Sequence, residues 1–223
     1  LPSDVVDLFK RSLLILMTQI DNGGAIIAAN DSDIRQYAKD TYSYMWPRDG
    51  ALVSYALMKA GYTTTCRKFF DFCANVITPY NFCASVMVEN GFLLHKYNPD
   101  GSFGSSWHPW VKGEEIHVPI QEDETALILW AIWQYYDLYR KIDVIRPLYH
   151  SFIEKTADFL VSYRDEQTGL PLPSYDLWEE RRGILSFTTA TVYGGLIAAA
   201  NLSDIFFRTE KAKLYRQTAL QIK

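Results

Sequence analysis

Residues 123–139 read DETALILWAIWQYYDLY, and an unbroken apolar run occupies positions 126–133. A helix that is apolar on every side is buried in the interior of a protein. Residues 144–164 differ, because apolar side chains recur there at the spacing of a single helical face. The two segments predict an inner helix followed by an outer helix. The apolar face of the outer helix consists of Ile145, Leu148, Phe152, Ala157 and Leu160.

The same couple precedes this stretch. Residues 49–60 are apolar almost all round and end at Gly61, so we expect a helix that is buried on every side. Residues 65–77 carry a one-faced apolar stripe and should pack against a core. A further helix is predicted over residues 3–20, where the turn-forming sequence Asn22-Gly23-Gly24 ends it.

A third couple follows. Residues 186–200 are rich in Thr, Ala and Gly, which allow helix backbones to approach closely, and a charged helix is expected over 205–222 after a start at Ser203-Asp204. Repeated inner and outer helices predict an all-α fold, an α/α toroid in which an outer ring covers an inner ring. The chain would supply about half of such a toroid, as one partial catalytic domain over residues 1–223 with no second domain.

Long connections enter each predicted inner helix. The segments 21–47, 78–120 and 165–184 exceed the usual length of helix-helix loops, which favours a functional role. A short β excursion is expected over 93–97, followed by the turn 98–101. The strings YSYMWPRD (42–49), QEDE (121–124) and DLWEE (176–180) adjoin the three inner helices. If those helices are parallel, the strings share one face and line a cavity that suits a sugar.

Composition excludes several other classes of protein. The 223 residues carry a formal net charge of -4, which does not favour nucleic acid or an anionic membrane as a partner. No apolar run has membrane-spanning length. His95, His108, His117 and His150 lack metal-ligand spacing, and no glycine-rich phosphate loop occurs, so no metal or other cofactor is expected.

The cysteines are odd in number and lack paired spacing, which predicts reduced thiols and a cytoplasmic protein; they are Cys66, Cys73 and Cys83. A secreted protein remains an alternative, because the chain begins at Leu1 without an initiator methionine.

The motifs resemble a known family. Trp46-Pro47-Arg48-Asp49, the WHPW of 107–110 leading to QEDET at 121–125, and DLWEE at 176–180 are similar, in this order, to signatures of glycoside hydrolase family 15. The similarity covers residues 42–200 and is greater to the bacterial and archaeal, glucoamylase-like members. It implies an (α/α)6 barrel and an α-glucan or α-glucoside substrate. The implied reaction is inverting, exo-acting hydrolysis that releases β-glucose from non-reducing ends.

The resemblance also implies residue roles. Glu179 would be the general acid, and inversion needs a second carboxylate roughly 6.5–9.5 Å away. Glu179 must then be protonated near neutral pH, which apolar Trp178 and like charges at Asp176 and Glu180 would promote.

The substrate-binding set implied by the motifs is larger. Arg48 and Asp49 would bind hydroxyls of the terminal glucose, in a subsite shaped by Tyr42 and Trp46. Glu180 would bind the next sugar and Trp178 would pack on a pyranose ring. The remaining substrate-binding candidates are Trp110, Gln121 and Asp176.

Alternatives remain at this point. In the family the catalytic base follows later in the barrel, beyond Lys223, so we expect the 223-residue chain alone to be inactive. Trehalase or glucodextranase specificity would use the same motifs, and a non-catalytic carbohydrate-binding or regulatory toroid would keep the pocket.

Without context, Glu179 and Glu180 read as solvated charges and Asp49 as a helix N-cap. Trp130 and Trp133 are expected in the core.

Overall fold

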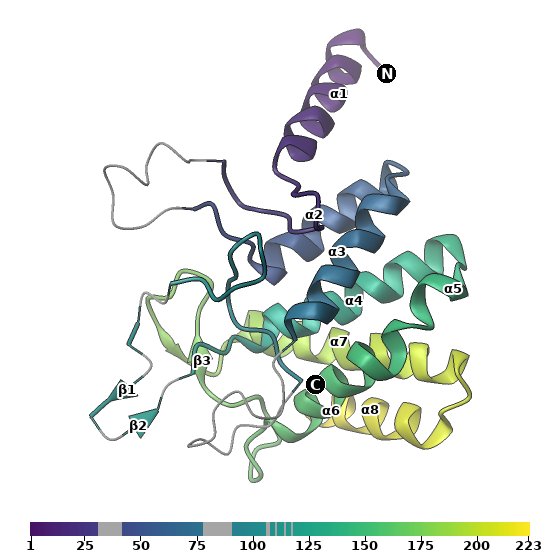
Figure 1. Ribbon diagram of the computed structural model, residues 1–223. Helices are drawn as coiled ribbons and strands as arrows, with labels where there is room; N and C mark the ends of the chain where they lie inside the picture. Colours follow the sequence, from purple (N-terminus) through teal and green to yellow (C-terminus); the bar gives the residue numbers. More distant parts are fainter. Residues whose placement is uncertain (31–41, 78–90, 106–107, 110, 114, 117) are drawn as a thin grey trace.

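The computed structural model describes residues 1–30, 42–77, 91–105, 108–109, 111–113, 115–116 and 118–223. Helices form most of the described chain (Figure 1), namely α1 (Ser3–Thr18), α2 (Pro47–Lys59), α3 (Thr63–Val76), α4 (Glu122–Tyr139), α5 (Ile142–Ile145), the π-helical turn η2 (Tyr149–Ile153), α6 (Glu154–Ser162), α7 (Ser186–Ile205) and α8 (Thr209–Ile222). Two short antiparallel hairpins accompany them, β1 (Val111–Lys112) with β2 (Glu115–Ile116), and β3 (Ser174–Tyr175) with β4 (Arg182–Gly183).

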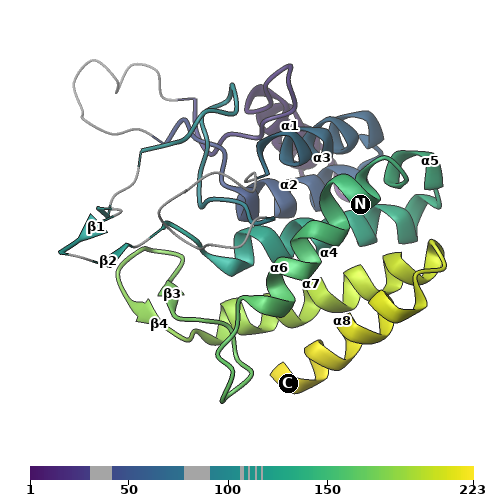
Figure 2. The ribbon, with the colours of Figure 1, turned by 60° about the horizontal axis from the view of Figure 1, so that its bottom comes forward.

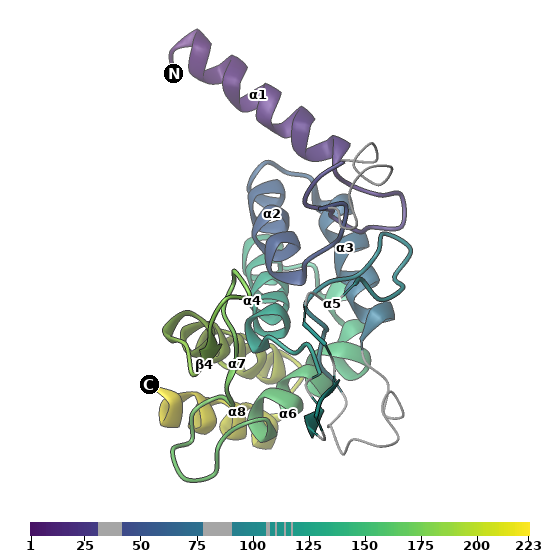
Figure 3. The same ribbon diagram turned by 90° about the vertical axis from the view of Figure 1, so that its left-hand side faces the viewer.

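The central helix is α4, which lies between α2 and α7 and is covered by α6 (Figure 3). Its first two turns are buried on every side, from Glu122 through Leu129. This confirms the prediction made from the apolar run of residues 126–133. Trp130 and Trp133, expected in the core, are half-buried and pack against it.

The prediction that residues 49–60 are buried all round is wrong. One face of α2 packs on α3 and α4, whereas Leu52, on another face, is exposed. Phe187 at the start of α7 is exposed as well. The described residues cover these two side chains only in part, so apolar composition overstated their burial.

Outer helices follow inner helices through short turns, as expected. The linkers 60–62, 140–141 and 206–208 lie at one end of the helices (Figures 1 and 2). The predicted helix 144–164 is interrupted, because Pro147 has no N–H to continue the α-helical bonding and η2 precedes α6. Ser203 and Asp204 lie inside α7 and do not start the last helix, which begins at Thr209.

Small residues bring the inner helices together. A Cβ atom added to Gly195 on α7 would lie 2.8 Å from the carbonyl oxygen of Ala126 on α4. On the outer side, the Tyr215 hydroxyl of α8 donates to Asp158 of α6 at 2.8 Å. The expected close packing of residues 186–200 is therefore confirmed.

The first helix stands apart from the others (Figures 1 and 3). None of its residues is buried, and its exposed apolar side chains include Leu8, Phe9, Leu14 and Ile15. The predicted turn at 22–24 ends this segment, since Ile20 and Ile26 form a β-bridge across it.

The described parts of the long connections lie at the end opposite the short turns (Figures 1 and 2). The predicted turn at 98–101 is present, with Gly101 N–H donating to Asn98 O at 2.9 Å. The strand expected over 93–97 forms single bridges instead of a ladder, from Leu94 to Ile120 and from Tyr97 to Met45 and Phe103.

Two further expectations concern the whole chain. Cys66 and Cys73 are buried free thiols, and Cys83 lies outside the described residues. None of the described helices combines the length and the apolar character needed to cross a membrane, and the cytoplasmic location stays a prediction.

Candidate active site

The N-terminal ends of α2, α4 and α7 meet at the carboxylate of Asp123. Its Oδ2 accepts a hydrogen bond from Arg48 Nε of α2 at 2.5 Å, and its Oδ1 accepts one from Thr188 Oγ1 of α7 at 3.4 Å. The three helices are thus parallel in the sense expected from the sequence, and the strings that adjoin them share one face of the molecule.

Arg48 is the buried cation of this junction. Its guanidinium also donates to Gln121 Oε1 and lies 2.9 Å from Glu124 Oε1, while its backbone N–H donates to Glu124 Oε2. Burial alone would lower the pKa of Arg48, but the carboxylates of Glu124 and Asp123 outweigh it, and the pKa is raised. The guanidinium is therefore a fixed, buried positive charge at the N-terminal ends of α2 and α4.

Gln121 connects this junction to the third string. Its Nε2 donates to the backbone oxygen of Asp176 at 3.3 Å. Asp176 begins the tip of the β3–β4 hairpin, which the sequence did not reveal. The Asp176 carboxylate accepts the N–H groups of Glu180 at 2.8 Å and Arg181 at 3.3 Å. Partial burial would raise the pKa of Asp176, but these backbone donors lower it.

Glu179 has an unusual backbone at this tip. Its φ of 56° lies in the left-handed region, which costs a non-glycine residue roughly 1–3 kcal/mol. The turn buries Glu179, only 9% exposed, and leaves Trp178 80% exposed. Trp178 is thus turned outward, and the expectation that it supplies the apolar shield of Glu179 is wrong.

Two histidines flank Glu179 in place of Trp178. The buried His95 places Nε2 3.5 Å from Glu179 Oε1. His108 Nε2 lies 2.8 Å from the backbone oxygen of Glu179, and its ring stacks on Tyr175 at a centroid distance of 3.9 Å. Because a carbonyl oxygen only accepts, His108 must carry its proton on Nε2.

A buried cation lies near the same face. Lys96, only 1% exposed, has its Nζ 4.8 Å from the ring centroid of Tyr44 and 5.5 Å from that of Trp46. Tyr42, whose ring centroid lies 6.0 Å from that of Trp46, is exposed. The aromatic residues before α2 therefore include the buried Tyr44 and Trp46 as well as the exposed Tyr42.

Acidic side chains of the site differ in their environment. Burial raises the pKa of Glu122 to about 7 and the pKa of Glu124 well above its usual value. Asp49 lies at the surface, where partial desolvation raises its pKa more than Arg48 lowers it. Glu180 is exposed. The site therefore combines buried acids of raised pKa with surface carboxylates.

The structure brings together most of the predicted set. Arg48, Gln121, Asp176 and Glu179 belong to one bonded cluster, which Asp49, Trp46, Tyr42, Trp178 and Glu180 adjoin in sequence. Trp110 lies outside the described residues.

Sequence reasoning missed His95, Lys96 and His108 as site residues. His95 and Lys96 could have been noticed as two polar residues inside the apolar run 92–97. Their contacts with distant residues could not be predicted from the sequence.

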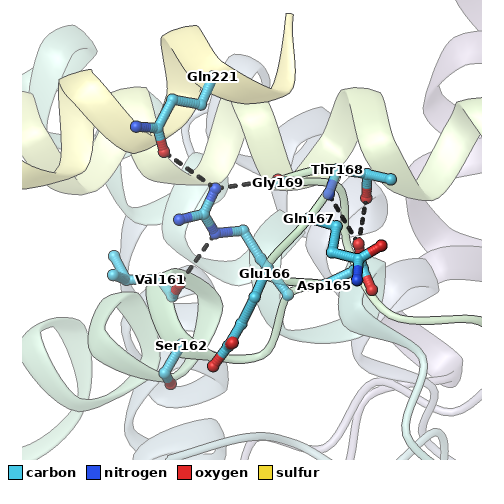
Figure 4. Close-up of a pocket in the computed structure, with 9 residues that line it drawn as sticks. Val161, Ser162, Asp165, Glu166, Gln167, Thr168, Gly169 and Gln221 are labelled. Atoms are coloured by element: carbon cyan, nitrogen blue, oxygen red, sulfur yellow. Dashed lines mark hydrogen bonds between the residues drawn. The ribbon is translucent and has the colours of Figure 1, made fainter.

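A separate hollow of about 440 Å³ lies where α6 and α8 end (Figure 4). Arg164 crosses it, donating to Val161 O, Gly169 O and Gln221 Oε1. No residue of the predicted site lines this hollow. In the part of the chain that the structure describes, no group of three or more His, Cys, Asp or Glu side chains is placed to hold a metal ion.

Known proteins share both the sequence and the fold. An uncharacterised glycosyl hydrolase of Methanocaldococcus jannaschii is 29% identical over 96% of this chain and 29% of its own length. Trehalase 2 of Sulfolobus acidocaldarius is 28% identical over 92% of this chain and 36% of its own length. The chain therefore spans about a third of the length of the curated relatives it matches.

Solved structures confirm the predicted toroid. A bacterial glucoamylase complexed with acarbose superposes with a TM-score of 0.70 at 24% identity, over 96% of this chain and 27% of that one. The glucoamylase of Saccharomycopsis fibuligera gives 0.72 at 21% identity, over 99% of this chain and 48% of that one. The sequence profile of the glycosyl hydrolases of family 15 matches residues 6–223. The chain belongs to this family of glycosyl hydrolases.

Proposed function

We propose that the protein containing this chain is an inverting, exo-acting α-glucosidase that releases β-glucose from the non-reducing ends of α-glucosidic chains. The observation that carries the proposal is Glu179, a carboxyl group that a left-handed backbone turns inward at a hairpin tip. Glucoamylases among the similar solved structures support this substrate class.

Glu179 acts as the general acid in this proposal. It donates its proton to the glycosidic oxygen as the bond to the anomeric carbon breaks, and the leaving sugar departs as a neutral alcohol. A second carboxylate removes a proton from water, which attacks the opposite face of the ring and inverts the configuration. The buried setting of Glu179 keeps bulk water away from the proton that is transferred.

The surrounding residues divide into frame and contact surface. Arg48 donates to Gln121, which donates to the backbone oxygen of Asp176, so the three residues fix the position of the hairpin. In this proposal they also belong to the substrate-binding set. The exposed members bind the sugar in this proposal, with carboxylates accepting hydroxyl protons and rings packing on pyranose faces. They are Tyr42, Asp49, Trp178 and Glu180, with Trp46 and Trp110 as further subsite residues.

The catalytic base is placed outside residues 1–223 in this proposal, and residues 1–223 are taken as one part of a single catalytic domain. The chain spans about a third of its curated relatives, in accord with a site completed elsewhere in the protein. The 223-residue chain alone is then expected to hydrolyse no α-glucoside.

Trehalose is the second candidate substrate, because one relative is named a trehalase. A glucodextranase would act on dextran with the same acid. A non-catalytic carbohydrate-binding or regulatory toroid is the candidate of another class, and it would bind glucose without releasing any.

Glucose release by the intact protein from maltose, isomaltose, dextran and trehalose tests these alternatives, with the anomer recorded by proton NMR before mutarotation. Glu179→Gln is expected to reduce hydrolysis by about 10²-fold or more, while glucose binding persists. Glu166→Gln, in an exposed loop, is the matched control for loss of a carboxylate. Full activity of the Glu179 variant, or initial release of α-glucose, contradicts the proposal.

A further inference from the structure

His95 is held rigidly beside Glu179. Its backbone N–H donates to Pro119 O at 3.1 Å, and the preceding residue Leu94 forms a β-bridge with Ile120 at the start of the α4 string. The side chain is 2% exposed and directs Nε2 toward Glu179 Oε1 at 3.5 Å. The imidazole is thus fixed by the backbone pairing of its segment and by burial of the ring.

Neither ring nitrogen of His95 has a hydrogen-bond partner among the described residues. A buried, unsatisfied polar group costs about 1–3 kcal/mol, so its presence calls for a partner formed in another state of the site. The 3.5 Å separation from Oε1 is at the long limit of a hydrogen bond. Catalytic hydrogen bonds are often long without substrate and shorten when substrate is bound.

The ring of His95 is neutral at physiological pH. Burial is the largest cause, and the charges of Lys96, Arg48 and His108 add to it. The backbone of Pro119 acts against them, and the net effect lowers the pKa of His95 to about 3. The charged and titratable groups around the ring are Lys96 on its own segment, Arg48 of α2, His108 and Glu179. A neutral imidazole carries a single N–H and donates from one nitrogen only.

We propose that His95 is a positioning residue for the general acid, with Nε2–H donating to Oε1 of Glu179. This inference rests on the proposed function of Glu179. With Oε1 accepting from His95, the acidic proton resides on Oε2 and is transferred from there to the glycosidic oxygen. His95 keeps its own proton throughout, and its hydrogen bond strengthens as negative charge develops on the carboxylate.

His108 has a different part in this arrangement. It donates to the backbone oxygen of Glu179 and so supports the left-handed turn, and its Nε2 also lies 3.9 Å from Glu179 Oε2. The two histidines together fix the backbone and the side chain of one residue. Only a change at His95 is then expected to alter proton donation without altering the turn.

Kinetics of the intact protein test the role of His95. The substrates are the disaccharide that it cleaves, maltose or trehalose, and α-glucosyl fluoride, whose leaving group departs without a proton. His95→Leu is expected to lower kcat for the disaccharide by about 10- to 100-fold, and kcat for the fluoride by less than about threefold. His95→Gln, which keeps an N–H near the Nε2 position, is expected to recover most of the loss.

The pH profile gives a second readout. Loss of a donor to Oε1 disfavours the carboxylate, so the alkaline limb of kcat/KM should move to higher pH in His95→Leu. His150→Leu is the matched control, because His150 is exposed and its Nδ1 lies 2.8 Å from Glu154 Oε2, in a pair on the outer helix. Equal losses on both substrates, or a shift to lower pH, overturn the inference.

The tautomer of His95 provides a test that needs neither activity nor a substituted protein. Nitrogen-15 NMR of the histidine-labelled intact protein should show His95 protonated at Nε2 between pH 6 and pH 8, an interval well above its pKa of about 3. Protonation at Nδ1 overturns the inference. If the intact protein cleaves no α-glucoside, the proposed function fails, and the tautomer still decides the position of the His95 proton.

Discussion

Arg48 at the start of α2 and Glu124 at the start of α4 form a buried ion pair, with Nη2 and Oε1 2.9 Å apart. Burial raises the pKa of Glu124 well above its usual value, and Arg48 acts against that shift. Each charge is tolerated in the interior because the other lies beside it. The two inner helices are therefore joined by electrostatics at the same end that carries the site.

Replacement of Arg48 by methionine is expected to reduce the free energy of unfolding by about 3–5 kcal/mol at pH 7, because buried carboxylates lose their cation. Urea unfolding of the intact protein measures the change. Near pH 4 the difference should shrink, since the pKa of Glu124 is raised and its protonated carboxyl needs no cation. Arg140→Met removes an exposed ion pair with Asp137 and should cost less than about 1 kcal/mol. Equal losses in the two variants would contradict this account.

Sequence reasoning recovered the helices because burial leaves a periodic pattern. The stripe of α3, with Cys66, Phe69, Phe70 and Cys73 all buried, is readable without coordinates. Boundaries were harder to predict, because the break at Pro147 and the end of α7 depend on local geometry. Which side chains of α2 are buried depends on the elements that pack against it, and the sequence of α2 alone does not show these.

The site was predictable only in part. The three strings were found because they adjoin inner helices, and parallel helices bring their starts together. The β3–β4 hairpin has two residues per strand, too few for a pattern, and the left-handed φ of Glu179 has no signature in the residue itself. The approach of His95 to Glu179 joins distant parts of the chain, so only tertiary structure reveals it.

Glu122, at the first position of α4, predicts a specific pH dependence. Burial raises its pKa to about 7, although the Ser174 side chain and the backbone of Glu122 act against that shift. Between pH 4.5 and pH 7 the folded state therefore holds a proton that the unfolded chain has released. The free energy of unfolding then falls as the pH rises through this interval, by on the order of 3 kcal/mol.

Glu122→Gln removes this dependence and keeps the size of the side chain. The difference in unfolding free energy between the variant and the wild type should shift in favour of the variant by on the order of 3 kcal/mol from pH 4 to pH 8. Urea titrations at both pH values measure it. Glu166→Gln supplies the background for loss of one surface carboxylate. A pH-independent difference for Glu122→Gln would show that this side chain does not hold a proton in the folded state.

Gly195 and Gly194 on α7 form a matched pair for testing the packing of the inner helices. Alanine in place of glycine favours a helix by roughly 0.5–1 kcal/mol at either position. At Gly194 an added Cβ meets no described atom within 4 Å, so the gain should appear as a small rise in Tm. At Gly195 the Cβ would lie 2.8 Å from the oxygen and 3.0 Å from the Cα of Ala126, which are backbone atoms that cannot rotate away.

Gly195→Ala should therefore push α7 from α4 and lower the free energy of unfolding by about 1–3 kcal/mol despite the better helix propensity. Scanning calorimetry of the two variants measures opposite shifts of Tm, of roughly 2–4 °C per kcal/mol for a domain of this size. The same displacement would draw Thr188 away from Asp123 and loosen the junction beneath Glu179, so activity should fall in Gly195→Ala and stay unchanged in Gly194→Ala. A Tm for Gly195→Ala at or above that of Gly194→Ala would show that the backbones of α4 and α7 are not in contact there.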